Sequence, residues 1–209
     1  MSEYGYIPEA PEQSFGNNKG IFTPKDIYDL TRADKYTNYG QLELIETKNV
    51  SASSSAIFTD IQESTYNVHF LTTNDIEVGT DGADLYIRFF ENGVEESGSV
   101  YQYAYQAGNS SGTFSESRTT TSTFIRGSWA MGTAGNEVSN NQMYFYNLGD
   151  STKYSFQTAH WTQLDNAGVY AFGFGSAVLP QASTVNQIKI YAETGTFSGT
   201  ISLYGIRYS

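Results

Sequence analysis

From residue 41 onward, hydrophobic and polar residues alternate along the chain with a period of two. In one such run Tyr66, Val68 and Phe70 share a face, and in another Ile188 and Ile190 face away from Lys189. This alternation is typical of strands with one buried and one wetter side, and it predicts packed antiparallel sheets. The predicted strands are Leu42–Thr47, Tyr66–Thr72, Asp84–Glu91, Val100–Gln106, Met143–Leu148, Tyr154–Trp161, Gly168–Phe174, Gln187–Ala192 and Thr200–Tyr208, with weaker candidates at Ser55–Thr59 and Thr121–Ser128.

The number of strands indicates the fold class. About eleven strands within about 170 residues favour an all-β antiparallel β-sandwich over residues 41–209, with a jelly roll as the best single interpretation. The runs are not separated by helical segments, which argues against a parallel α/β sheet. Gly205 interrupts the last run and indicates a bulge there.

The first forty residues follow a different pattern. Residues 1–22 show neither strand nor helix periodicity and predict an extended arm. Residues 23–40 hold one short helix and a linker, with Thr23 as N-cap and Pro24 at the first helical position. Apolar residues in the arm and on the helix are candidate anchors to a neighbouring molecule. They are Tyr4, Tyr6, Phe15, Ile21, Phe22, Ile27 and Leu30.

Composition narrows the function classes. The chain has a formal charge of −11, an isoelectric point near 4.5 and only 11 Lys and Arg residues, which argues against nucleic-acid binding. No apolar run approaches the ~20 residues that span a bilayer, so we expect no membrane insertion. The chain has no Cys, which excludes disulfides and thiolate chemistry.

Candidate chemistry is sparse. His69 and His160 are the two histidines, and the sequence contains no nucleophile signature that would make either one a catalytic base. The acidic stretch of residues 75–84 has the oxygen ligands that Ca²⁺ prefers, but its spacing departs from the EF-hand pattern and its Asp-Gly pair is ordinary turn chemistry. We therefore expect no catalytic residue, no metal and no cofactor. Carboxylates for glycoside hydrolysis give an equally weak signal, since none has an evident apolar pocket.

Four aromatic residues are candidates for sugar binding. Tyr101, Tyr103 and Tyr105 share one face of a predicted strand, and Trp161 lies near the end of another. Exposed aromatic rings of this kind form platforms for sugar rings, whereas buried ones form a core or a subunit contact. The core or contact interpretation is favoured.

Two segments carry a family resemblance. SFGNNKGIFTPKDIYDL at Ser14–Leu30 and VLPQASTVNQIKIYAETGTFSGTISLYGIRYS at Val178–Ser209, together with YGQLELIET at Tyr39–Thr47, resemble virion structural proteins of marine tailed bacteriophages, particularly phages of cyanobacteria. The TISLYGI ending is similar to the final strand of jelly-roll domains in phage tail, fibre and head-decoration proteins. The resemblance implies an anchoring N-terminal segment, a compact β domain, no cofactor and symmetric homo-oligomers, a trimer among them.

The sequence therefore favours a non-enzymatic virion structural protein, assembled in the bacterial cytoplasm as a head-decoration or tail-associated subunit. Its expected partners are other virion proteins: capsid, portal, tail or fibre components. The alternative is a tail-fibre or receptor-binding module that recognises host surface glycans. A polysaccharide depolymerase is the least favoured hypothesis.

Overall fold

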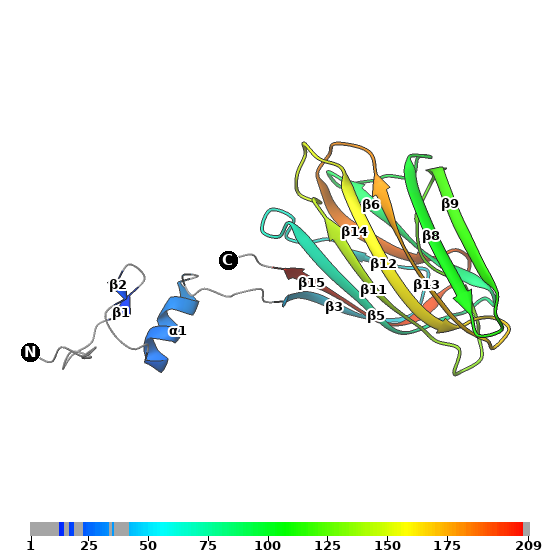
Figure 1. Ribbon diagram of the computed structural model, residues 1–209. Helices are drawn as coiled ribbons and strands as arrows, with labels where there is room; N and C mark the ends of the chain where they lie inside the picture. Colours follow the sequence, from blue (N-terminus) through cyan, green and yellow to red (C-terminus); the bar gives the residue numbers. More distant parts are fainter. Residues whose placement is uncertain (1–12, 15–16, 19–22, 34, 36–41, 207–209) are drawn as a thin grey trace, which may run out of the picture. The chain divides into compact units, whose positions relative to one another are not determined.

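The computed structural model describes residues 13–14, 17–18, 23–33, 35 and 42–206. Its contacts divide the chain into two compact units. One consists of Met1–Gly40 with Tyr208–Ser209, and the other of Gln41–Arg207. Figure 1 shows the larger unit as two layers of strands.

The smaller unit contains the predicted helix, α1 (Pro24–Arg32). Its capping box is formed: the Asp26 amide donates to the Thr23 hydroxyl at 3.3 Å, and the Thr23 amide donates to an Asp26 carboxylate oxygen at 2.8 Å. These bonds satisfy two backbone donors that a helix start leaves open. The prediction of a short helix with Thr23 as N-cap and Pro24 at its first position is confirmed, and the helix ends at Arg32 after nine residues.

Residues 13–18 differ from the prediction. β1 (Gln13–Ser14) pairs with β2 (Asn17–Asn18) in an antiparallel two-stranded sheet, with Gln13 opposite Asn18 and Ser14 opposite Asn17. The expectation of a segment without strand structure is wrong here, because pairing of so few residues leaves no alternating pattern to read.

The larger unit is a sandwich of a wide and a narrow antiparallel sheet. The wide sheet has eight strands in the order β3–β15–β5–β11–β12–β13–β8–β9, and the narrow sheet has the order β10–β6–β14–β4 with β7 paired to β6. The strands are β3 (Leu42–Ser53), β4 (Ser55–Phe58), β5 (Val68–Val78), β6 (Ala83–Glu91), β7 (Val94–Glu95), β8 (Tyr101–Asn109), β9 (Phe114–Ser122), β10 (Ile125–Met131), β11 (Ser139–Tyr146), β12 (Ser155–Leu164), β13 (Tyr170–Leu179), β14 (Val185–Ala192) and β15 (Phe197–Ile206).

Eight of these strands have the order of a jelly roll. β3, β15, β5 and β11 lie side by side in one sheet, and β4, β14, β6 and β10 in the other. Along the chain this set alternates between the sheets except at the step from β6 to β10, which stays in the narrow sheet. Such alternation produces the two Greek keys of a jelly roll. The predicted fold class is confirmed.

Two hairpins are inserted into this framework. β8–β9 enters between β6 and β10, and β12–β13 enters between β11 and β14. Both hairpins join the wide sheet beyond β11, so they double its width (Figure 1). The outer face of this extension is therefore a feature of the insertions rather than of the framework.

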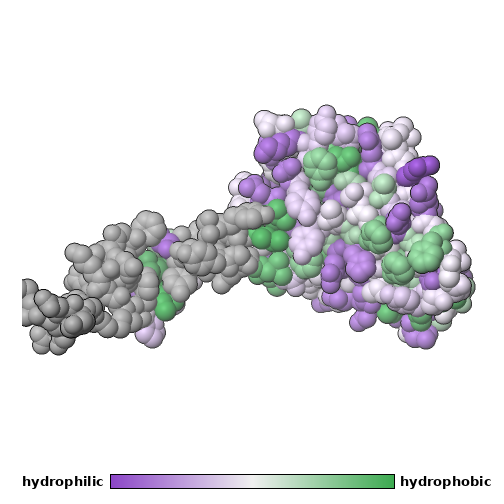
Figure 2. Space-filling view, viewed as in Figure 1, coloured by the Kyte–Doolittle hydropathy of each residue, from purple (hydrophilic) through white to green (hydrophobic). Residues whose placement is uncertain are grey.

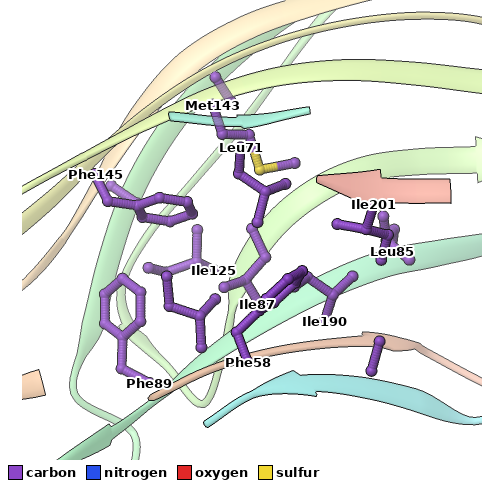
Figure 3. Close-up of a cluster of buried hydrophobic side chains, with 14 of the residues drawn as sticks. Phe58, Leu71, Leu85, Ile87, Phe89, Ile125, Met143, Phe145, Ile190 and Ile201 are labelled. Atoms are coloured by element: carbon purple, nitrogen blue, oxygen red, sulfur yellow. The ribbon is translucent and has the colours of Figure 1, made fainter. Parts of the chain in front are cut away.

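The core lies between the two sheets. Leu85, Ile87 and Phe89 of β6 point inward, and the inward side chains of the wide sheet meet them. Figure 3 shows this cluster, with Met143 and Phe145 of β11 facing Phe89 and Ile125 of the narrow sheet. All of these side chains are completely buried, and burial of apolar surface is the main stabilising term of the sandwich.

Two details of the wide sheet add to the predictions. In β5 the inward residues are His69 and Leu71, whereas Phe70 faces outward and contacts Tyr144 with ring centroids 4.7 Å apart. Around Gly205, β15 pairs regularly with β5, but its pairing with β3 shifts register between Leu203 and Tyr204, so the predicted irregularity lies next to the glycine and only on the β3 side. A Cβ at Gly205 would lie 2.4 Å from the ring of Tyr66, so the glycine makes room for that ring.

Candidate interaction surface

The four aromatic residues considered for sugar binding do not form a surface platform. Tyr101, Tyr105 and Trp161 are exposed by 2% or less and belong to the core, and Tyr103 packs against that core. The Tyr105 hydroxyl donates to Gln157 Oε1 at 2.8 Å, and the Tyr101 hydroxyl accepts from the Phe89 amide at 3.0 Å. Burial raises the pKa of both phenols. The three tyrosines share one face as predicted, and that face is the inner one, which agrees with the favoured core interpretation rather than with the sugar-binding alternative.

The opposite, outer side of the same strands forms the candidate surface. Four consecutive strands of the wide sheet, β11, β12, β13 and β8, contain no Asp, Glu, Lys or Arg. Only the edge strand β9 lies beyond them on the β8 side. The whole chain is 16% charged, so four adjacent strands without charge mark this region as different from the remaining surface. We call the outward side of these four strands the charge-free face.

Large aromatic side chains are exposed on the charge-free face. Tyr144 is 38% exposed, Phe156 43%, Tyr170 47% and Phe174 49%. Single exposed apolar residues are common, but several exposed aromatic residues on one uncharged surface indicate an interaction site. Figure 2 looks onto these strands and shows hydrophobic side chains spread over the face among polar ones.

The strand register arranges the outward side chains in rows across the sheet. Three successive rows cross β12, β13 and β8. They are Phe156–Val178–Gln102, then Thr158–Ser176–Ala104, then His160–Phe174–Gln106. On these three strands the middle row consists of small residues and forms a short valley, which Tyr144 of β11 closes at one end and Arg118 of β9 at the other, while Phe174 stands out of the third row as a ridge.

A groove of about 580 Å³ lies at one end of this valley. Ala104 and Ser176 line its floor, Phe156 lies on the β12 side, and Arg118 lies on the edge strand β9. Arg118 is 3.6 Å from Glu116, so even the cation beside the groove has an acidic neighbour. A smaller hollow of about 190 Å³ lies beside His160, lined by polar side chains such as Asn140 and Gln142. Both hollows offer amide and hydroxyl groups together with aromatic surface.

The outer face of the narrow sheet has the opposite character. Glu95 receives bonds from Arg88 at 2.9 Å and from Lys189 at 3.0 Å, and both cations lie within 5.2 Å of the Tyr191 ring centroid. Burial opposes the charged form of Glu95, but the bonds from Arg88 and Lys189 outweigh it and lower its pKa. This face is therefore charged, and its charges are paired within the sheet.

A second ion pair lies near the end of the narrow sheet. Asp84 contacts Arg126, accepts from the Ala130 amide at 2.8 Å and receives the Tyr86 hydroxyl at 3.3 Å. Burial raises the pKa of Asp84, while Arg126 and the Ala130 amide act in the other direction. Each carboxylate oxygen thus has a protein donor, which makes the pair a structural element of the sheet edge.

The candidate catalytic and metal groups do not assemble into a site. His69 is fully buried, its Nε2 is 2.7 Å from the Ile61 carbonyl oxygen, and burial lowers its pKa. His160 is exposed on the charge-free face. Within the described part of the chain, no three His, Cys, Asp or Glu side chains lie close enough together to hold a metal ion, those of residues 75–84 included. No helix among the described residues is long and apolar enough to cross a membrane.

Most of the predicted anchors cannot be placed. Tyr4, Tyr6, Phe15, Ile21 and Phe22 lie outside the described residues. On α1, Ile27 is 37% exposed and Leu30 is partly buried, and the helix contains no fully buried residue. Ile27 is thus exposed enough for contact, as is its neighbour Tyr28 at 64%, whereas Leu30 is partly covered.

The exposed aromatic residues of the charge-free face were missed at the sequence level. Tyr144, Phe156, Tyr170 and Phe174 all lie in predicted strands, but the pattern was read for their core-facing neighbours. The signal that identifies them is the absence of charge from both faces of several strands in an acidic chain. A strand with a solvent-facing side usually carries charged residues there.

No protein-family model matches the chain, and a search of curated proteins found no match. The fold and the surface define its class: a jelly-roll β-sandwich in which two inserted hairpins extend one sheet, and in which four strands of that sheet, β8, β11, β12 and β13, form an uncharged outer face with exposed aromatic residues.

Proposed function

We propose that the chain is a non-enzymatic structural protein of a tailed-phage particle, in which the charge-free face and the N-terminal unit make contacts with other virion proteins. The resemblance of Ser14–Leu30 and Val178–Ser209 to phage structural proteins supports the proposal that the chain belongs to a phage particle. The observation that supports an assembly role is the exposure of Tyr144, Phe156 and Phe174 on strands without a charged residue. The cores of protein interfaces are depleted of charge and enriched in aromatic residues.

The chemistry of the helix agrees with an anchoring role. α1 is well capped, but a nine-residue helix is marginal in water without packing. Ile27 and Leu30 are one turn apart and so lie on one side of the helix. Burying them against a neighbouring protein would stabilise the helix. Repetition around a particle then adds avidity to contacts that are individually weak.

Incorporation into particles tests this function. Particles assembled with the wild-type chain are compared by quantitative mass spectrometry with particles assembled with Phe156→Ser/Phe174→Ser, with a chain lacking residues 1–22, or with Val94→Ser. Val94 is 71% exposed on the small β7 hairpin, so Val94→Ser is a matched control for loss of an exposed apolar residue. We expect the double substitution and the deletion each to lower the number of copies per particle at least about tenfold, and Val94→Ser to leave it unchanged. Absence of the wild-type chain from purified particles contradicts the proposal.

A second candidate function is recognition of a neutral glycan. The groove of about 580 Å³ favours it, because its volume lies in the usual range for small ligands and Phe156 and Gln102 offer an apolar surface beside an amide. An array of neutral oligosaccharides probed with wild-type chain and with Phe156→Ala tests this candidate. Binding that Phe156→Ala abolishes and Tyr154→Ala retains supports it. Tyr154 is also exposed, at 48%, but it does not line the groove.

A further inference from the structure

The charges of the chain indicate which partner fits the charge-free face. This inference rests on the proposed function, since it names the partner of the surface on which that function depends. An interface for a basic partner would present acidic side chains, because opposite charges are matched across interfaces. The chain has 22 acidic residues, yet β8, β11, β12 and β13 carry none of them. Two strongly acidic proteins repel each other least when the surfaces in contact carry no charge. Another copy of this chain, with its formal net charge of −11, is such an acidic partner.

The relief of the face is self-complementary. The valley of Thr158, Ser176 and Ala104 runs beside the row that contains Phe174. A two-fold axis that runs parallel to these two rows and between them places Phe174 of each copy over Ser176 of the other. The ridge of each copy then enters the valley of the other copy. In a two-fold interface each contact of one residue with another occurs twice, which this arrangement satisfies. We propose that two copies of the chain pack through the charge-free face about such an axis.

The size of the face is sufficient for a specific but weak contact. Four strands spaced about 4.8 Å apart, each about 28 Å long, give about 500 Å² of sheet per copy and about 1,000 Å² in total. Specific interfaces bury at least about 1,000 Å² of surface in total, and those at this lower limit belong to weak or transient complexes. The pair therefore forms reversibly in solution, with a dissociation constant in the micromolar range, and is reinforced where copies are held close together on a particle.

Charge substitution at the valley gives a sharp test. Sedimentation equilibrium of the full-length chain is measured from about 1 µM to about 200 µM, where a micromolar dimer passes from mostly monomer to mostly dimer. Ser176→Glu places two like charges near the axis, and we expect the dissociation constant to rise at least about tenfold. Gln187→Glu makes the same change of charge on the outer face of the narrow sheet and leaves the constant unchanged. Ser176 and Gln187 are not buried, so both variants keep the core intact, and Thr158→Glu serves as a second valley variant.

Mixing variants of opposite charge separates direct contact from general damage. Ser176→Glu and Ser176→Lys are each monomeric alone, and an equimolar mixture forms a heterodimer because the two charges then attract across the axis. Because the chain contains no Cys, Ser176→Cys is also a single-thiol variant, which a short bis-maleimide links into dimers, whereas Gln187→Cys stays unlinked.

A wild-type chain that remains monomeric at about 200 µM overturns the proposal. So does a Ser176→Glu chain that dimerises as strongly as Gln187→Glu, or a mixture of the two valley variants that stays monomeric. The proposed function fails separately, through absence of the chain from particles. A monomeric chain that is incorporated, and whose Phe156 binds a neutral oligosaccharide from the array, assigns the face to a glycan instead of a second copy.

Discussion

At the scale of single residues, the sandwich depends on glycines that make room for aromatic rings. Gly173 lies opposite Trp161 in the wide sheet, and a Cβ there would be 1.9 Å from the indole ring. Gly205 provides the same space for Tyr66. In both places the missing side chain lets a large ring lie flat against the backbone, which keeps the inner layer dense.

Gly173→Ala should therefore destabilise the domain. The added methyl group cannot fit without moving Trp161, and overpacking of this kind costs about 1–3 kcal/mol. Urea unfolding followed by tryptophan fluorescence measures the loss. Ser176→Ala, on the same strand but on the outer face, is the control and should change the free energy of unfolding by less than about 0.5 kcal/mol. Equal stability of the two variants would show that Trp161 is not held in this position.

His69 makes the stability of the domain depend on pH. Its Nε2 is hydrogen-bonded to Ile61, its Nδ1 has no partner, and burial lowers its pKa from the ordinary value of 6.5. Because the folded protein disfavours the protonated ring, the contribution of His69 is fully present above pH 6.5 and is lost as the pH falls toward the lowered pKa. The slope from this one group is at most about 1.4 kcal/mol per pH unit.

Substitution of each histidine isolates this effect. Chemical denaturation between pH 7 and pH 5 should show a loss of stability that is reduced in His69→Gln, which keeps a side-chain donor for Ile61. His160→Gln, on the exposed face, should follow the wild type. A wild-type slope that persists in His69→Gln would assign the acid sensitivity to other groups.

The direction in which residues face was the least predictable property at this scale. The pattern in β8 correctly groups Tyr101, Tyr103 and Tyr105, but the other side of the strand carries only Gln and Ala in this stretch, so neither side is marked by charge as the wet one. In β5 both faces contain apolar residues, and the side with His69 and Leu71 is the buried one. Alternation defines two faces, and only a charged residue or the partner sheet shows which of them is buried.

At the scale of elements, the helix start was predictable because its signal is local. Thr23, Pro24 and Asp26 act through bonds within one turn. The edge strand β9 (Phe114–Ser122) was missed for the opposite reason, since the weaker candidate Thr121–Ser128 contains only its last two residues and continues into β10. Its sequence FSESRTTTS is polar on both faces, and an edge strand is held by backbone bonds to β8 without burying a regular apolar side.

Removal of the cap should loosen α1 without affecting the sandwich. Thr23→Ala deletes the hydroxyl that accepts from Asp26 and should weaken the helix by about 1 kcal/mol. Amide hydrogen exchange of residues 24–32 in the full-length chain measures this change. Thr23→Ser keeps the hydroxyl and should retain the wild-type exchange rates. Identical exchange in Thr23→Ala and Thr23→Ser would contradict a stabilising role for the capping box.

At the scale of the whole molecule, the arrangement of the sheets creates the surface on which the functional proposal depends. The jelly-roll framework needs only four strands in each layer, and the inserted hairpins add an equal width of sheet to one layer. The framework was predictable from the number of strands and the missing crossovers. The extension was not, because the order of strands in a sheet depends on pairings between distant segments, such as β8 with β13, that no local pattern specifies.

The outer faces of the two sheets differ in charge. On the narrow sheet Arg88, Glu95 and Lys189 form a paired network, whereas the charge-free face of the wide sheet (β8, β11, β12 and β13) carries no Lys, Arg, Asp or Glu. The charge-free face thus combines little electrostatic repulsion with exposed aromatic area, which are the two properties that an interface between acidic subunits requires.

Hydroxyl-radical footprinting of the chain, free in dilute solution and within assembled particles, tests this account most directly, because it measures the exposure of individual side chains. The account predicts that Tyr144, Phe156, Tyr170 and Phe174 lose reactivity on assembly, while Tyr191 on the outer face of the narrow sheet keeps it. If the four aromatic residues react as fast in particles as in the free chain, the charge-free face is not a contact surface and the account is contradicted.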